Sequence, residues 1–320
     1  MKALTFSGDL RFERNASVPR REDEALVQVI CAGICNTDLE IVKGYAGFHG
    51  IPGHEFVGRV VESPDPLLME KRVVGEINAG CGRCELCLLG DPRHCADRTV
   101  LGIKGRDGAF AEFLSLPTRN LIEVPSSVSD DAALFVEPLA AACNILEQVE
   151  ITSADAVAVI GDGKLAQLVV IALARTSLLT VIGRHREKLE LAQSFGAHRV
   201  LLDEPSLLSE CSASFDVVIE ASGSPSGLAT ALSVVKPRGR VVLKSTHHQT
   251  TPVELSQIVV NEVTIVGSRC GRFRSALDLL VSNPIDLSAL ISQRLALEEG
   301  LRAFEEAAAP QCLKVVLQME

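Results

Sequence analysis

The spacing of apolar residues changes near residue 125 and again near residue 268. Before residue 125, short β-like runs such as 25–30 and 56–61 are broken by glycine and proline. This is typical of a twisted, mostly antiparallel β domain. After residue 267, the chain predicts one or two amphipathic helices and a final apolar run at 314–317. We expect this tail to pack onto the first domain.

The residues between 125 and 267 follow a different pattern, in which predicted strands alternate with predicted helices. A continuous apolar run at 156–160 indicates a parallel strand buried on both faces of its sheet. The elements predicted after it are a helix over 164–175, a strand over 178–182, a helix over 186–195 and strands over 215–219, 240–244 and 263–266. This alternation predicts a doubly wound α/β sheet.

Composition limits the classes of protein to which the chain can belong. Its 320 residues suffice for two domains, and 47% hydrophobic with 22% charged residues is typical of a globular protein. A net charge of −10 disfavours nucleic-acid or anionic-membrane partners, which require a basic face. The longest apolar stretch, 165–174, is too short to span a bilayer, and no secretory signal is evident. We therefore expect a cytoplasmic protein with no membrane partner.

A glycine-rich turn separates the strand predicted at 156–160 from the helix that follows it. Gly161 permits a tight turn, Gly163 lets the backbone approach a pyrophosphate, and Ala166 is small enough for helix–strand packing. Lys164 and Leu165 begin the helix, whose free N–H groups attract phosphate. The turn predicts a dinucleotide site, and the alternative is a glycine turn that binds no ligand.

The end of the second strand of this region bears on the choice between NAD and NADP. NAD sites place an acidic residue about 20 residues after the glycines, where it holds the ribose 2′-hydroxyl. Here that place contains Gly183, Arg184 and Arg186, and no acid. Because an arginine can bind a 2′-phosphate, we expect NADP to be preferred over NAD. The alternative is that both arginines only begin a solvated helix.

Four of the ten cysteines crowd into one short segment, Cys81, Cys84, Cys87 and Cys95. Four thiolates can close a tetrahedron around zinc with no open position, which defines a structural site. His94 could replace one of them, but four cysteines already satisfy the metal. Disulfides are not predicted, because a cytosolic chain keeps its thiols reduced.

A second group of possible metal ligands is dispersed along the sequence. It comprises Cys35, His54, Glu55 and Glu137. One cysteine, one histidine and one carboxylate would leave zinc a fourth position for water or substrate, as a catalytic site requires. Spacing alone does not join these residues, because a single histidine or glutamate is more often structural or solvated.

Five motifs together resemble those of the zinc-containing medium-chain dehydrogenase/reductase family, which includes alcohol, sorbitol, threonine and glucose dehydrogenases. They are GICNTD at 33–38, GHE at 53–55, the cysteine lobe at 81–95, EP at 137–138 and GDGKLA at 161–166. The resemblance covers nearly the whole chain. It implies an α/β fold with a GroES-like catalytic domain at 1–124, a Rossmann NAD(P)-binding domain at 125–267 and a C-terminal segment, 268–320, that completes the catalytic domain.

The resemblance also implies ligands for a catalytic zinc ion. Cys35 and His54 match two ligand positions of the family. The third protein ligand would be Glu55 or Glu137, and the resemblance leaves both open. In the polyol, threonine and sugar branches, the glutamate of GHE can bind the metal while the later glutamate holds a zinc-bound water or exchanges with it.

Further roles follow from the same resemblance. Thr37 lies where the family keeps a hydroxyl beside the substrate oxygen, so it would pass the alcohol proton outward. Glu40 stands where many relatives continue the relay with a histidine, which leaves the path beyond Thr37 open. Ser245 and Arg269 are expected to contact the cofactor, whereas His247 and His248 are expected in a surface loop.

Together these features predict a dehydrogenase with one catalytic and one structural zinc ion that transfers hydride between an alcohol and NADP. The alcohol would be a polyol, a sugar or a secondary alcohol. A second possibility is a specialised biosynthetic dehydrogenase that oxidises a hydroxyethyl group on a larger substrate. A third is a non-catalytic zinc- and nucleotide-binding protein. Relatives often join sheets through the last Rossmann strand, here near 263–266, so we expect a homodimer or homotetramer.

Overall fold

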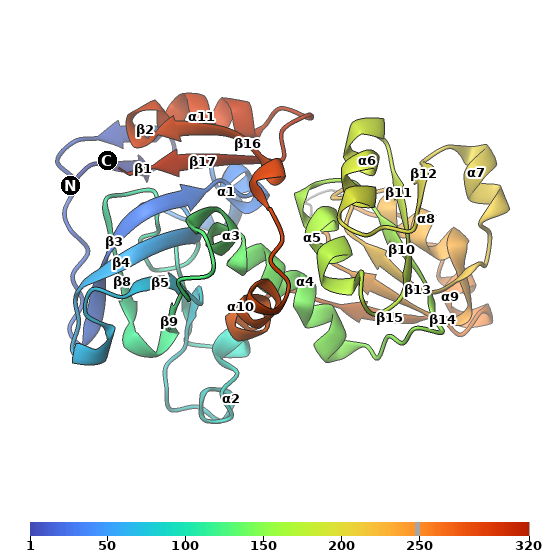
Figure 1. The fold of residues 1–320 in the computed structure, drawn as a ribbon, viewed down its shortest axis with the longest axis horizontal. Coiled ribbons are helices and arrows are strands. Elements are labelled where there is room, and N and C mark those ends of the chain that lie inside the picture. Colours follow the sequence, from blue (N-terminus) through green and yellow to red (C-terminus); the bar gives the residue numbers. More distant parts are fainter. Residues whose placement is uncertain (247–249, 320) are drawn as a thin grey trace. The chain divides into compact units, whose positions relative to one another are not determined.

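A computed structural model of the protein describes residues 1–246 and 250–319, so His247 and His248 lie outside the described residues. The chain forms two compact units (Figure 1). The first contains Met1–Glu137 together with Phe273–Glu320, and the second contains Pro138–Arg272. These divisions fall later than the predicted ones, which were after residues 124 and 267.

The first unit is built around a twisted sheet of seven strands in the described part of the chain. The strand order is β16-β17-β3-β4-β5-β9, and β8 pairs with β3 outside this path. All pairings are antiparallel except β16 with β17. The strands are β3 (Glu24–Gly33), β4 (Glu55–Glu62), β5 (Arg72–Gly75), β8 (Phe113–Pro117), β9 (Leu121–Glu123), β16 (Ile291–Ala296) and β17 (Lys314–Gln318). Strand β17 thus brings the end of the chain beside β3.

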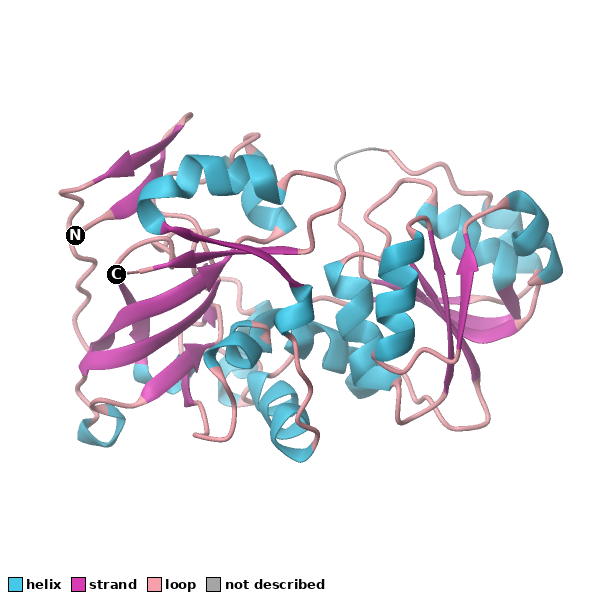
Figure 2. Cartoon of the chain, turned by 45° about the horizontal axis from the view of Figure 1, so that its top comes forward, coloured by secondary structure: helices cyan, strands magenta, loops and turns pink. Residues whose placement is uncertain are grey.

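Shorter elements surround this sheet (Figure 2). Two small antiparallel pairs join β1 to β2 and β6 to β7. These elements are β1 (Ala3–Phe6), β2 (Leu10–Glu13), β6 (Asn78–Ala79), β7 (Thr99–Val100), α1 (Asn36–Ile41), α2 (Glu85–Leu88), α3 (Asp130–Leu134), α10 (Phe273–Ser282) and α11 (Gly300–Ala307). The division between the units falls inside α4 (Val136–Gln148).

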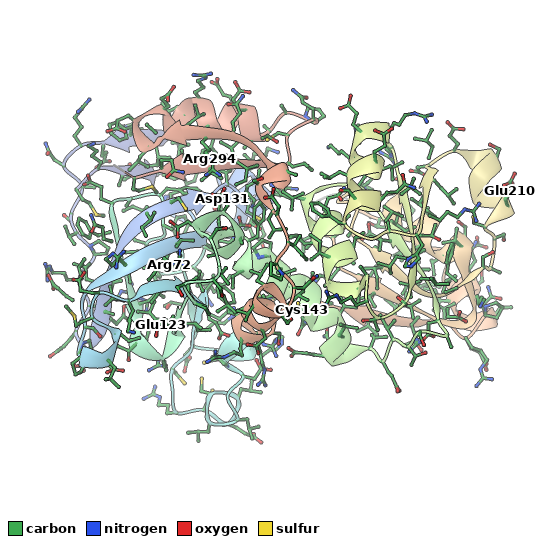
Figure 3. The ribbon with its side chains drawn as sticks, viewed as in Figure 1. Arg72, Glu123, Asp131, Cys143, Glu210 and Arg294 are labelled. Carbon is green, nitrogen blue, oxygen red and sulfur yellow. The ribbon has the colours of Figure 1, made fainter. Side chains whose placement is uncertain are left out.

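Helix α3 explains why the first unit extends beyond residue 124. Ser129 caps the helix by accepting a hydrogen bond from the backbone N–H of Ala132. Two ion pairs then tie α3 to the sheet: Arg72 with Asp130 at 2.8 Å, and Arg294 with Asp131 at 2.6 Å (Figure 3). Because Arg72 lies on β5 and Arg294 on β16, the helix belongs with the strands of the first unit.

The second unit contains a six-stranded sheet in the described residues, and all of its pairings are parallel. The strand order β12-β11-β10-β13-β14-β15 is that of a doubly wound dinucleotide-binding sheet. Its elements are β10 (Ala156–Ile160), α5 (Lys164–Leu173), β11 (Leu178–Gly183), α6 (Arg186–Ser194), β12 (Arg199–Leu202), α7 (Pro205–Glu210), β13 (Phe215–Glu220), α8 (Gly227–Val234), β14 (Val235–Leu243), α9 (Leu255–Val260) and β15 (Thr264–Gly267). The predicted α/β fold class is confirmed.

The core of the second unit follows from its apolar strands and helices. Four of the five residues of β10 are buried, as expected for a strand covered on both faces. Helix α5 is buried from Ala166 to Leu173, which agrees with its apolar residues on every side. Within the described residues, no helix is long and apolar enough to cross a membrane.

Candidate functional site

The four cysteines of the lobe come together at one point. Their sulfur atoms all lie within 4.8 Å of one another. Cys95 is buried, and Cys81, Cys84 and Cys87 are half-buried. Cys84 directly precedes the short helix α2, and Cys87 lies within it. The arrangement suits a tetrahedral metal ion without an open position.

The backbone of the lobe is adapted to this cluster. A side chain at Gly80 would place its Cβ 2.6 Å from the Cys87 sulfur, so only glycine fits there. Arg119 holds the segment by donating a hydrogen bond to the Gly80 carbonyl at 2.8 Å. Backbone hydrogen bonds lower the pKa of Cys81 to about 6, and the one from Arg83 contributes most. A thiolate is the form of cysteine that binds metal.

The second cluster is assembled from two separate places in the sequence. Cys35 precedes α1 at the end of β3, and His54 directly precedes Glu55, the first residue of β4. The metal-binding atoms of these three residues lie within 4.8 Å of one another. His54 and Glu55 are buried, and Cys35 is half-buried. Antiparallel pairing of β3 with β4, in which Gly33 faces Glu55, produces this convergence.

Asp38 connects the two chain segments that carry the cluster. Its carboxylate is fully buried and accepts hydrogen bonds from the backbone N–H of Cys35 at 2.8 Å and of Gly53 at 3.2 Å. The Nδ1 atom of His54 lies 3.2 Å from the same carboxylate. Burial lowers the pKa of His54, but Asp38 and Cys35 outweigh it and raise the pKa well above its ordinary value. His54 Nδ1 has no hydrogen-bond partner among the described residues, so its contact with Asp38 is a charge contact.

Lys314, on β17, forms a buried ion pair with Glu55. The pair crosses β3 over Gly33, where a Cβ would lie 2.7 Å from Glu55 Oε2 and 3.1 Å from Lys314 Cδ. Glycine therefore makes room for the pair. Burial lowers the pKa of Lys314, but Glu55 and Cys35 more than compensate and raise it. The ammonium also lies 5.8 Å from the centre of the Phe135 ring, a cation–π contact.

The other predicted catalytic residues have different positions. Glu55 Oε1 is buried and has no hydrogen-bond partner among the described residues. Glu137 lies in the first turn of α4, is half-buried and is not part of the three-residue cluster. Thr37 lies in α1 and is half-buried. The structure thus gathers Glu55 with Cys35 and His54, and it leaves Glu137 outside that group.

The glycine turn of the second unit has the features expected of a phosphate-binding turn. Gly161 has φ +116°, and a Cβ there would lie 2.7 Å from the Ala221 carbonyl oxygen. Gly163 precedes α5 and faces open space within 4 Å, so a ligand can approach its backbone. Ala166 is buried in the helix–sheet contact. Lys164 and Leu165 form the first turn of α5.

A pocket opens at the carboxyl ends of β10, β11 and β13, where doubly wound sheets bind their ligands. Asp162 lies at its base and accepts hydrogen bonds from the backbone N–H of Arg184 at 2.6 Å and of His185 at 2.7 Å. His185 Nδ1 also lies 3.0 Å from this carboxylate. The pocket is lined by Ile160, Gly161, Asp162, Ile182, Gly183, Arg184, His185, Asp203, Ser222, Ser224, Ser226, Gly227 and Thr230.

The remaining predicted cofactor residues lie elsewhere in the second unit. Arg186 is exposed at the start of α6 and is not among the residues that line the pocket. Ser245 follows β14; its hydroxyl donates to Glu220 at 3.0 Å and accepts from the N–H of Gly223 at 2.7 Å. Arg269 is exposed, and its carbonyl accepts a hydrogen bond from Lys244 at 2.9 Å.

Sequence reasoning missed several residues that organise these sites: Asp38, Asp162, Asp203, Glu220 and Lys314. Asp38 belongs to the motif GICNTD and Asp162 to GDGKLA, so both carboxylates could have been predicted to lie near the sites. Lys314 had a weaker signal, a single charge at the start of an apolar run. Its partner, Glu55, is 259 positions away in sequence, and only strand pairing brings them together.

Two family models match the chain over most of its length. The alcohol dehydrogenase GroES-like domain matches residues 21–126, and the zinc-binding dehydrogenase matches residues 167–282. The first match lies within the unit that contains both metal clusters. The second covers most of the doubly wound sheet. The matches agree with the order of the motifs in the sequence.

Individual proteins resemble the chain over almost its whole length. An L-threonine 3-dehydrogenase from Bacillus licheniformis is 30% identical over 317 residues, which cover 92% of this chain and 91% of that protein. The structure of the Escherichia coli alcohol dehydrogenase RspB with NADH has a TM-score of 0.90 and 27% identity and covers 99% of both chains. A zinc-binding dehydrogenase from Sinorhizobium meliloti bound to NADP has a TM-score of 0.88 and 28% identity, covering 99% of this chain and 98% of that one.

The fold and the clusters therefore define a zinc-type dehydrogenase. This chain belongs to the zinc-containing medium-chain dehydrogenase/reductase family and is an oxidoreductase. The family, fold class and enzyme class expected from the sequence are confirmed.

Proposed function

We propose that the protein transfers hydride between an alcohol and NADP, with a polyol, a sugar or a secondary alcohol as the substrate. The observation that carries this proposal is the convergence of Cys35, His54 and Glu55, whose metal-binding atoms lie within 4.8 Å of one another. A catalytic centre needs three such protein ligands and one open position. The overall reaction converts the alcohol and NADP⁺ to a carbonyl compound, NADPH and a proton.

The residues present suit a zinc ion at this cluster. One thiol, one imidazole and one carboxylate are a donor set typical of zinc. The buried Glu55 Oε1, which lacks a hydrogen-bond partner in the described residues, would otherwise be unsatisfied. Zinc held there would supply Lewis-acid chemistry to a substrate oxygen. Glu137 is the alternative third ligand, and the geometry favours Glu55.

The surrounding residues have proposed roles in orientation and proton transfer. The Asp38 carboxylate, 3.2 Å from His54 Nδ1, would attract the ring when it is protonated, and it fixes the backbone of Cys35 by a hydrogen bond. The Oγ1 hydroxyl of Thr37 accepts the alcohol proton and passes it toward solvent, because α1 places Thr37 two residues after Cys35 and leaves it half-buried. Beyond the buried Asp38, the next titratable group on α1 is Glu40, which is half-buried like Thr37.

The preference for NADP rests on Arg184. This residue lines the nucleotide pocket at the end of β11, where an NAD site has an acid. Its guanidinium can form charge-assisted hydrogen bonds with a 2′-phosphate. Arg186 is a weaker candidate, since it is exposed outside the pocket lining. Ser245 and Arg269 remain proposed contacts of the nicotinamide half.

Three further proposals concern a structural zinc ion, the oligomeric state and the cellular location. The four-cysteine lobe holds a structural zinc ion, which its closed set of four sulfurs supports. The protein assembles as a homodimer or homotetramer through β15, the last strand of the parallel sheet. Exposed apolar side chains on and beside this edge, at Val259, Val260 and Ile265, support such an interface. We place the enzyme in the cytoplasm.

The test is a survey of turnover by reduced-nicotinamide absorbance. Polyols, aldoses, secondary alcohols and amino alcohols are each tried with NADP and NAD, before and after zinc removal. We expect turnover that requires zinc and favours NADP. Absence of turnover from protein that holds zinc and binds NADP would contradict the proposal. It would favour a hydroxyethyl group on a larger molecule as substrate, or a non-catalytic role.

A further inference from the structure

An acidic residue faces Arg184 from the neighbouring strand of the parallel sheet. Asp203 directly follows β12, and its carboxylate lies 3.2 Å from the Nε atom of Arg184. Both residues line the nucleotide pocket. The acid that NAD sites carry after the second strand is therefore absent from β11 but present one strand further along the sheet.

The register of the sheet explains this meeting. Gly183 pairs with Leu202 in the parallel ladder between β11 and β12. Arg184 and Asp203 are the next residues of the two strands, and the backbone N–H of Asp203 donates to the Gly183 carbonyl at 2.8 Å. Because parallel strands end at the same edge, both side chains project at the ligand-binding end of the sheet.

Arg184 is held from two sides. Besides the contact with Asp203, its terminal nitrogen donates to the Ser226 hydroxyl at 3.2 Å, at the start of α8. A 2′-phosphate that binds this guanidinium must share it with the Asp203 carboxylate. The phosphate carries about −1.5 to −2 charge at neutral pH, so the two anions repel each other. A ribose 2′-hydroxyl carries no charge and meets no such penalty.

The other carboxylate of the pocket cannot act in this way. Asp162 is buried and already accepts three hydrogen-bonding groups, the N–H groups of Arg184 and His185 and the His185 ring. The Asp203 side chain is 18% exposed and forms an ion pair with Arg184. Asp203 is thus the acid placed to oppose a second anion at Arg184.

We propose that Asp203 restrains the preference of this enzyme for NADP, by opposing the 2′-phosphate at Arg184, and so keeps NAD usable. This inference rests on the proposed role of Arg184. It makes cofactor choice the outcome of two opposed charges on adjacent strands. Removing the acid shifts the balance toward NADP, and removing the arginine shifts it toward NAD.

The experiment measures calorimetric binding of 2′,5′-ADP and 5′-AMP to the full-length, zinc-loaded protein. These nucleotides differ only in the 2′-phosphate and lack nicotinamide, so the readout does not depend on turnover. The variants are Asp203→Asn, Arg184→Ala and the control Glu204→Gln, which removes the same charge from an exposed neighbour. Asp203→Asn should tighten 2′,5′-ADP about fivefold to tenfold relative to Glu204→Gln and change 5′-AMP less than about twofold.

The outcomes separate this inference from the proposal beneath it. If Arg184→Ala weakens 2′,5′-ADP selectively but Asp203→Asn behaves like Glu204→Gln, the role of Asp203 is wrong while that of Arg184 stands. If Arg184→Ala weakens both nucleotides equally, the basis for NADP preference is wrong, and the inference falls with it. Weaker 5′-AMP binding by Asp203→Asn would also overturn it, since Asp203 would then hold the ribose itself.

Discussion

The two clusters of potential metal ligands in this chain are built in opposite ways. The four-cysteine lobe takes all its potential ligands from residues 81–95, and a backbone N–H, that of Cys81, donates to the Cys95 sulfur. The cluster of Cys35, His54 and Glu55 joins the ends of two strands and lies among buried charges. Those charges, Asp38 and Lys314, contact the ligands themselves.

This difference shows how each cluster relates to folding. A lobe of local ligands has little core of its own, so its order depends on the metal. The dispersed cluster is set by strand register and by hydrogen bonds that exist without metal. We therefore expect metal loss to unfold the first site, and to abolish the catalytic activity of the second without unfolding it.

The largest effect is expected from breaking the four-cysteine lobe. Cys87→Ser should remove one zinc ion per chain and destabilise the protein by several kcal/mol, because metal binding supplies the folding free energy of the lobe. Calorimetry should show a fall in Tm of about 10 °C or more. Cys312→Ser is the control, since Cys312 is a half-buried cysteine outside both clusters. A Cys87→Ser protein with unchanged zinc content would contradict the structural site.

The dispersed cluster should respond differently to loss of a ligand. Cys35→Ser should lower kcat by about 10³-fold or more, because Lewis-acid stabilisation contributes several kcal/mol to the transition state. The unfolding free energy should change by only about 1 kcal/mol. Cys31→Ala, at a buried position of β3 four residues before Cys35, should retain activity. If the Cys35→Ser protein lost its folded structure as well as its activity, both clusters would be structural.

A smaller and conditional effect is expected at Lys314. In zinc-free protein, Lys314→Met leaves Glu55 as an unpaired buried charge, which costs about 3–5 kcal/mol. In zinc-loaded protein the metal compensates part of this charge, so the substitution should lower the free energy of unfolding by less. Urea unfolding with and without zinc measures both values, and Lys314→Arg tests whether charge alone suffices. Equal destabilisation in the two states would exclude coupling between the ion pair and the metal.

The sequence predicted the second unit well because its signals are local. The apolar run at 156–160, the glycine turn and the helix over 164–175 correspond to β10, the turn at Gly161 and α5. Strand β12 was not predicted, because its apolar run, 200–202, is only three residues long. The lobe of cysteines was likewise visible as a motif, and its four sulfurs do converge.

The dispersed site could be predicted only in part. Cys35, His54 and Glu55 were connected by resemblance, and no spacing rule would have joined them. Lys314 and Asp203 depend on which strands become neighbours, β17 with β3 and β12 with β11. Such pairings are long-range, so the residues that tune the metal ligands and Arg184 emerge only from the structure.

The contrast between the clusters is tested most directly by zinc stoichiometry with X-ray absorption of the metal. We predict two zinc ions per chain, one with four sulfur ligands and one with a single sulfur, an average of about 2.5 sulfurs per zinc. The remaining ligands of the second ion should be nitrogen and oxygen. One zinc ion per chain with four sulfurs would contradict the account, since the Cys35 cluster would then hold no zinc.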